Sequence, residues 1–205
     1  MKLYTSMGPN PRLVRMFMAE KGLSVDEVAV DLIAGENRRE PFLSKNPAGQ
    51  LPALELDNGE ILCETTAICE YLEETHPQPA LIGSTPEQRA EARMWARRVD
   101  LKVCEPLAGG FRYAEGASIF QSRMRIIPEA AEGLKAQARD GIEWIDGQLG
   151  DQQFLCGDRL TMADLMLFAF LDFGVNVGQP LPEGCPMIEA WYARMKERKS
   201  AAATA

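Results

Sequence analysis

Strand-like alternation of apolar residues is confined to the first third of this chain, and none follows Pro86. The segments after Pro86 instead repeat apolar residues with the spacing of helices. Two stretches that cannot continue a helix, His76-Pro77-Gln78-Pro79 and Gly83-Ser84-Thr85-Pro86, separate the two patterns. The sequence therefore predicts an α/β domain at residues 1–78, a linker at 79–86 and an all-helical domain at 87–205.

Short strands and helices alternate in the first domain. Lys2–Thr5 is predicted to be a strand, and alternation over residues 28–32 predicts a second strand. Between them, apolar residues on one helical face predict a helix from Pro11 to Lys21 that stops at Gly22. A strand, a helix and a strand within so few residues imply a parallel crossover.

A hairpin and a helix complete the first domain. The strands Leu51–Leu56 and Glu60–Cys63 flank Asp57-Asn58-Gly59, which is a strong hairpin signal. A helix is predicted from Thr65 to about Thr75. In the second domain, we expect helices at Gln88–Ala114, Met124–Leu149, Met162–Gly174 and Met187–Lys199, and a frayed tail from Ser200 to Ala205.

Composition excludes several classes of protein. A net charge of −8 disfavours binding to nucleic acid, which requires a basic face. His76 is the only histidine and the five cysteines form no C-x-x-C pair, so no metal site is expected. No apolar stretch is long enough to span a membrane, and the N-terminus lacks the pattern of a signal peptide. We therefore expect a cytoplasmic protein with reduced thiols.

The segment Asn46-Pro47-Ala48-Gly49-Gln50-Leu51-Pro52-Ala53-Leu54 leads from a turn-rich loop into a strand that begins with proline. Because Pro52 cannot donate to the sheet, a tight turn or a cis bond is natural there. A cis bond would turn the N–H and C=O groups of Leu51 outward, where a peptide-like ligand could pair with them. An ordinary loop before an edge strand is the alternative interpretation.

Glu64-Thr65-Thr66-Ala67-Ile68 lies where the last strand leads into a helix. The N–H groups and the dipole at such a helix start favour a carboxylate, and Glu64 could accept from an ammonium group. A simple Thr65 cap beside a solvated glutamate is the alternative. Because the hairpin brings this helix start close to the proline loop, one ligand with a peptide backbone and an amino-acid end could touch both.

Together these motifs resemble the cytosolic glutathione transferase family over nearly the whole chain. The resemblance lies in N-P-x-G-x-L-P-x-L, the hairpin, E-T/S-x-A-I, the proline-rich linker and the helical remainder. It implies an N-terminal thioredoxin-like α/β domain (βαβαββα) followed by an all-α helical bundle. Residues 157–164 resemble a folding motif of the family, in which Thr161 and Asp164 would form a capping box.

The resemblance implies a reaction in which the thiolate of bound glutathione attacks a small hydrophobic electrophile. It also implies a homodimer and no metal. The residues expected to bind glutathione as co-substrate are Lys45, Gln50, Leu51, Pro52, Glu64 and Thr65. The residues expected in the second-substrate pocket are Met7, Pro9 and Tyr113.

A thiolate requires an activating donor, because a thiol with a pKa of about 8.5 is only slightly ionised at neutral pH. The family uses a Tyr, Ser or Cys in or after the first strand, and this sequence departs from that pattern. Ser6 and Asn10 are the candidates, although Ser6 could bond its own backbone and Asn10 could instead be an N-cap. G-P-N-P-R-x-V-R resembles the yeast Gtt2-like branch of the family. The resemblance implies that a water, or donors from the second domain, could activate the thiol. In this chain Tyr113 and Ser118 are the candidate donors of that kind.

Three functions are consistent with this sequence. Conjugation of glutathione to an electrophile is the first. A glutathione-transferase-like binding or scaffold protein without turnover is the second, because no activating residue is obvious. Glutathione-dependent peroxidase or lyase chemistry at the same site is the third. The sequence does not separate detoxification from a dedicated catabolic step.

Overall fold

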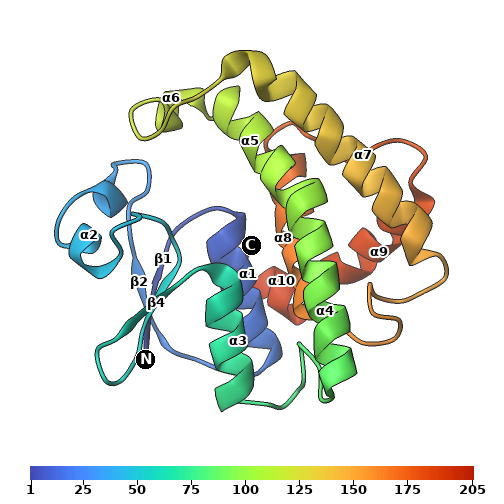
Figure 1. The fold of residues 1–205 in the computed structure, drawn as a ribbon, viewed down its shortest axis with the longest axis horizontal. Coiled ribbons are helices and arrows are strands. Elements are labelled where there is room, and N and C mark those ends of the chain that lie inside the picture. Colours follow the sequence, from blue (N-terminus) through green and yellow to red (C-terminus); the bar gives the residue numbers. More distant parts are fainter.

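A computed structural model describes residues 1–205 as a sheet-containing lobe beside a helical lobe (Figure 1). Strands β1 (Lys2–Thr5), β2 (Asp26–Ala29), β3 (Ala53–Glu55) and β4 (Ile61–Cys63) form one mixed sheet in the order β2-β1-β3-β4. β1 pairs parallel with β2 and antiparallel with β3, which pairs antiparallel with β4. The predicted crossover and hairpin are both confirmed.

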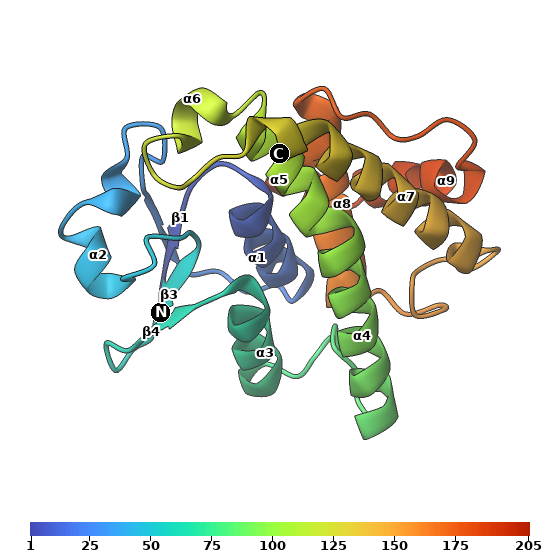
Figure 2. The ribbon, with the colours of Figure 1, turned by 45° about the horizontal axis from the view of Figure 1, so that its top comes forward.

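Helices α1 (Pro9–Glu20) and α3 (Thr65–Thr75) pack together between the sheet and the helical lobe (Figures 1 and 2). The single turns η1 (Glu36–Arg38) and α2 (Phe42–Lys45) lie at the outer side of the sheet. The second strand begins and ends earlier than predicted, at Asp26–Ala29, and after it the Asp31 carboxylate accepts from the Ala34 N–H at 2.8 Å and starts a turn.

The helical lobe contains every later element. They are α4 (Pro86–Val99), a π-helical turn η2 (Asp100–Cys104), α5 (Glu105–Tyr113), α6 (Ala117–Phe120), a 3₁₀ turn η3 (Pro128–Ala130), α7 (Ala131–Leu149), α8 (Met162–Asn176), α9 (Pro186–Lys196) and α10 (Lys199–Ala203). None of these helices is both long enough and apolar enough to cross a bilayer.

Several predicted helices differ in their bounds from the observed ones, and the helix predicted at Met187–Lys199 runs from Pro186 to Lys196. The helix predicted from Gln88 starts at Pro86 and passes through the π turn before α5. The helix predicted from Met124 begins only at Ala131, because proline is tolerated in the first turn of a helix and not in its interior. Pro128 accordingly opens the 3₁₀ turn that leads into α7.

The prediction of a frayed C-terminal tail was wrong. Residues 199–203 form α10, which packs against α1, and Ser200 and Ala201 are buried. The Ser200 hydroxyl donates to the Glu20 carboxylate at 2.5 Å, and the Arg198 guanidinium binds the same carboxylate through two bonds of 2.8 Å. A carboxylate far away in the sequence therefore fixes this tail.

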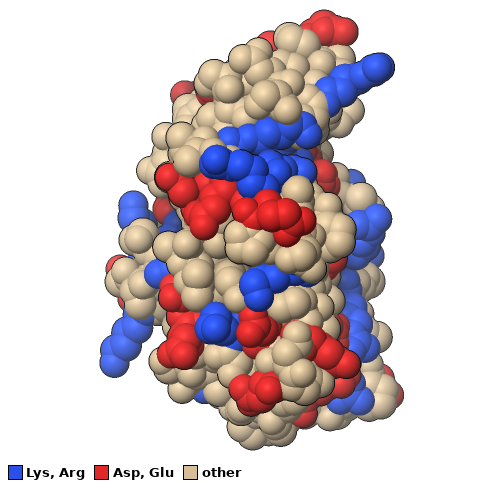
Figure 3. All heavy atoms as spheres, turned by 90° about the vertical axis from the view of Figure 1, so that its left-hand side faces the viewer, with Lys and Arg blue, Asp and Glu red and all other residues tan.

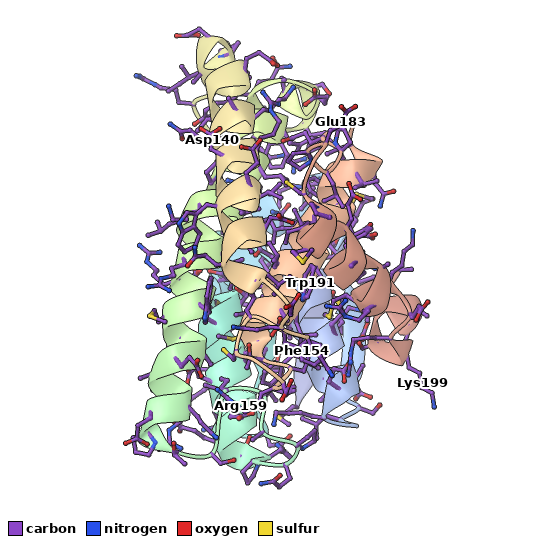
Figure 4. All side chains as sticks on the ribbon, turned by 90° about the vertical axis from the view of Figure 1, so that its right-hand side faces the viewer. Asp140, Phe154, Arg159, Glu183, Trp191 and Lys199 are labelled. Carbon is purple, nitrogen blue, oxygen red and sulfur yellow. The ribbon has the colours of Figure 1, made fainter.

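The predicted capping box at the start of α8 is confirmed. The buried Asp164 carboxylate accepts from the N–H and hydroxyl of Thr161, each at 2.9 Å, and from the Leu155 N–H at 2.9 Å. It also accepts from the Trp191 indole N–H at 3.3 Å, which ties α9 to α8 (Figure 4). Burial raises the pKa of Asp164 to about 6, and these four hydrogen bonds oppose the rise.

We expect Asp164→Asn to lower the free energy of unfolding by about 3 kcal/mol, because buried donors lose their acceptor and each unpaired group costs roughly 1–3 kcal/mol. Urea denaturation measures the change. Asp158→Asn is the matched control, since Asp158 is exposed in the same loop and makes no hydrogen bond. Equal unfolding midpoints for the two variants would contradict the role given to Asp164.

Candidate functional site

The proline loop is held rigidly by its own polar groups. The buried Asn46 side chain donates to the Gln50 carbonyl at 2.9 Å and accepts from the Ala48 N–H at 3.1 Å. The Leu51–Pro52 bond is cis, one of the two arrangements expected from the sequence. Neither the N–H nor the C=O of Leu51 makes a hydrogen bond within the chain. The loop therefore offers one free donor and one free acceptor of the backbone.

The start of α3 also leaves polar groups free. No side chain caps this helix, and the N–H groups of Thr65, Thr66 and Ala67 have no acceptor within the chain. Glu64 is the only non-glycine residue with a positive φ, 70°. Such a conformation costs roughly 1–3 kcal/mol and persists only where surrounding structure holds it. The helix start can thus accept an anion, beside a carboxylate that can accept from a cation.

These two segments meet at a cavity of about 570 Å³, here called the polar cavity. Of the residues expected to bind glutathione, those in its wall are Gln50, Leu51, Pro52, Glu64 and Thr65. Lys45 is not among them. Its ammonium group pairs with the Glu55 carboxylate at 3.0 Å and lies over the Tyr4 ring, which holds it on the outer side of the loop.

A second cavity of about 320 Å³, here called the apolar cavity, adjoins the first. Of the residues expected in the second-substrate pocket, Met7 and Pro9 line it and Tyr113 does not. Its wall is mainly apolar and includes four phenylalanines, of which Phe111 and Phe173 pack edge to face with ring centres 5.0 Å apart. The residues that line both cavities are Asn10, Gln50, Leu51, Arg112, Phe120 and Phe170. A ligand in one cavity therefore borders a ligand in the other.

The candidate activating residues occupy different places. Asn10 is the second residue of α1, and its side chain lines both cavities without a hydrogen-bond partner in the chain. The interpretation of Asn10 as an N-cap is wrong, because the helix already begins at Pro9 and Gly8 holds the cap position. Ser6, Tyr113 and Ser118 line neither cavity.

Sequence reasoning missed several charged residues of the polar cavity. They are Arg38 from η1, Asp100 and Glu105 from the second lobe, Arg112 at the end of α5, and Arg123 after α6. Glu105 and Arg112 are seven residues apart and so lie on one helical face. This spacing is the only local sequence pattern that links any of these charged residues. The convergence of these segments depends on how the lobes pack, which no short motif encodes.

Comparisons with known proteins agree with this architecture. A family model described as "Glutathione S-transferase, N-terminal domain" matches residues 3–80, and one described as "Glutathione S-transferase, C-terminal domain" matches residues 128–194. The chain is 34% identical over 200 residues to glutathione S-transferase 2 of Saccharomyces cerevisiae, covering 96% of this chain and 85% of that protein. It is 35% identical over 182 residues to maleylacetoacetate isomerase of Pseudomonas aeruginosa, covering 85% of this chain and 84% of that one.

Among solved structures, the crystal structure of Gtt2 from Saccharomyces cerevisiae superposes with a TM-score of 0.93 at 32% identity, covering all of both chains. A Gtt2-class glutathione S-transferase of Vibrio parahaemolyticus superposes with a TM-score of 0.84 at 30% identity, covering 100% of this chain and 97% of that one.

The protein's own thiols are poorly placed for nucleophilic chemistry. Four of the five cysteines are buried, Cys63 is half-buried, and none lines either cavity. Burial raises the pKa of every one of them, to about 11 for Cys156. Since the thiolate is the reactive form, the raised pKa values disfavour reaction of these cysteines at neutral pH.

We expect a thiol reagent to label the folded protein slowly at neutral pH and faster as the pH rises above about 9, because ionisation of a thiol with a raised pKa is shifted to higher pH. Cys63→Ser should remove the first-labelled site, and mass spectrometry of time points measures this. Fast labelling at neutral pH that survives Cys63→Ser would contradict the assignment.

Proposed function

The chain belongs to the glutathione S-transferase family, and from that membership we propose that it binds glutathione in the polar cavity and transfers it to an electrophile. One observation carries the proposal. The free backbone groups of Leu51 and the uncapped start of α3 border the same cavity. They complement a peptide ligand that ends in an amino-acid group, with Glu64 beside the ammonium and the N–H groups of Thr65 and Thr66 toward the carboxylate.

The proposed reaction begins with the thiol of bound glutathione, which loses its proton to solvent. The thiolate sulfur then forms a bond to an electrophilic carbon, and the leaving group departs with its electron pair. A hydrogen bond to the sulfur favours the thiolate over the thiol. Asn10 is the residue we assign to this bond, because its amide has no other partner and lines both cavities.

The electrophile is assigned to the apolar cavity, where Met7, Pro9 and the aromatic rings supply an apolar surface. Transfer at the boundary between the cavities needs no movement of either ligand out of its site, because six residues border both. Holding two reactants in this way lowers the entropic part of the barrier.

A glutathione-binding protein without turnover is the second candidate function. It is favoured by the position of Ser6 outside both cavities, since no hydroxyl of the first loop then faces a bound thiol. Peroxidase or lyase chemistry would begin with the same thiolate and differ only in the electrophile.

We assign the glutathione-binding domain to residues 1–78, the linker to 79–86 and the second-substrate domain to 87–205. The gap between the end of α3 and the start of α4 supports these bounds. We further propose a homodimer with α4 and η2 in its contact, because Met94 on α4 and Leu101 on η2 are 42% and 52% exposed. Five free cysteines are consistent with a cytoplasmic location.

Glu64→Gln should weaken glutathione binding about tenfold, because loss of a charge-assisted hydrogen bond of about 1.4 kcal/mol corresponds to that factor. Isothermal titration calorimetry measures the dissociation constant. Glu60→Gln, an exposed change in the hairpin, is the matched control and should leave it unchanged. If the unaltered protein failed to bind glutathione, the proposed function would be wrong.

Asn10→Ala should raise the pKa of the bound glutathione thiol by about one unit, which corresponds to 1.36 kcal/mol of lost preference for the thiolate. Ultraviolet absorbance of the thiolate, followed against pH, measures it. Ser6→Ala should leave that pKa unchanged. If Ser6→Ala raised the pKa of the bound glutathione thiol instead, Ser6 would be the activating residue. If that pKa were normal in the unaltered protein, the second candidate function, glutathione binding without turnover, would be favoured.

A further inference from the structure

Three arginines border the polar cavity without any ion pair to a carboxylate, although the chain carries a net charge of −8. They are Arg38, Arg112 and Arg123. Some arginines outside the cavity bind acids, as in the pairs Arg93–Glu70 and Arg198–Glu20, and others do not. Figure 3 shows Lys and Arg side chains gathered in a band across the upper part of the face that carries α2. Three acids, Glu64, Asp100 and Glu105, border the same cavity, so an anionic ligand is favoured only beside an arginine that lacks a partner.

Arg38 and Arg123 each have a nitrogen that is buried without a partner. Arg38 donates through another nitrogen to the Ala48 carbonyl at 3.1 Å, and Arg123 donates to the Ile33 carbonyl at 3.0 Å. Buried donors are normally paired, so both side chains have donor capacity left for a ligand.

Arg112 is the one arginine that borders both cavities. It makes no hydrogen bond in the chain, and its guanidinium lies 6.0 Å from the centre of the Phe120 ring. The acids of the polar cavity do not neutralise it. Arg97 holds Asp100 at 2.8 Å, and Glu105 lies two helical turns away, about 10 Å along the axis of α5.

Glutathione does not require all three arginines. It carries two carboxylates and one ammonium, and the start of α3 and Glu64 complement its amino-acid end. Arg38, beside the proline loop, is close to where the peptide chain would continue, and suits the second carboxylate. Arg112 and Arg123 then remain without a partner. Only Arg112 also reaches the apolar cavity.

We propose that the second substrate is an aromatic electrophile that carries a carboxylate, and that Arg112 determines this specificity by binding the carboxylate. The phenylalanines of the apolar cavity contact the aromatic ring of this substrate. Arg123 adds a positive charge at the wall of the polar cavity. This inference rests on the proposed function. Arg112 is a specificity residue for the second substrate and contributes nothing to thiol activation.

Two substrates that differ by one carboxylate group test the inference: neutral chlorodinitrobenzene and its carboxylate analogue, chlorodinitrobenzoate. In each, the thiolate forms a carbon–sulfur bond and chloride leaves with its electron pair. Rates are divided by the uncatalysed rate for each compound. Arg112→Gln should lower kcat/KM for the carboxylate about tenfold to one-hundredfold more than for the neutral substrate, the range of a charge-assisted hydrogen bond.

Arg125→Gln is the matched control, because Arg125 is exposed nearby, lines neither cavity and carries the same charge. Arg112→Lys should restore part of the preference, since lysine keeps the charge and loses the planar fork. An equal loss on both substrates would overturn the inference. So would weaker glutathione binding in Arg112→Gln with an unchanged preference for the carboxylate, because the arginine would then serve glutathione.

A binding measurement separates this inference from the proposed function. Nitrobenzoate and nitrobenzene are titrated into the full-length protein in the presence of glutathione. Nitrobenzoate should bind at least about tenfold more tightly, and Arg112→Gln should abolish the difference. Absence of turnover with a preserved preference for nitrobenzoate would disprove only the transferase reaction. Turnover of the neutral substrate with equal binding of the two probes would disprove only the inference.

Discussion

The buried carboxylate of Asp164 holds the helical lobe in the arrangement on which both cavities depend. It joins the loop at Leu155, the start of α8 at Thr161 and the indole of Trp191 on α9. A buried carboxylate is costly unless its oxygens are fully hydrogen-bonded, so these partners must assemble together. α8 then carries Phe170 into the walls of both cavities. The site thus depends on a carboxylate that lies outside it.

The second requirement is a fixed joint between the lobes. Arg12 on α1 pairs with Asp172 on α8, and Asp172 also accepts from the Tyr192 hydroxyl at 2.5 Å. α10 covers α1 from the other side through Glu20. Since Asn10 and Phe170 border the same cavities from these two helices, the joint sets how far apart the opposing walls of these cavities lie. Ion pairs with few solvent contacts suit this role because their geometry is specific.

The features predicted correctly from the sequence are those with short-range causes. Asp57-Asn58-Gly59 favours a turn through its own residues, and Thr161 and Asp164 are only three residues apart. The features that could not be predicted have distant causes. Glu20 anchors the start of α10, and Glu55 pairs with Lys45, which does not line the polar cavity. Arg112 and Arg123 belong to segments whose meeting with the first lobe is decided only by packing.

The same contrast explains why the part of the site on the first lobe could be predicted from the sequence, whereas the part on the second lobe could not. The first lobe offers backbone groups, those of Leu51 and of the first turn of α3, whose positions follow from a proline loop and a helix start. Their chemistry does not change when neighbouring side chains change. The second lobe offers side chains, among them Arg112 and Phe120. Under the proposed function, the ligand of the first lobe is therefore set by the fold, whereas the choice of its reaction partner is set by a few side chains on α5, α6 and α8.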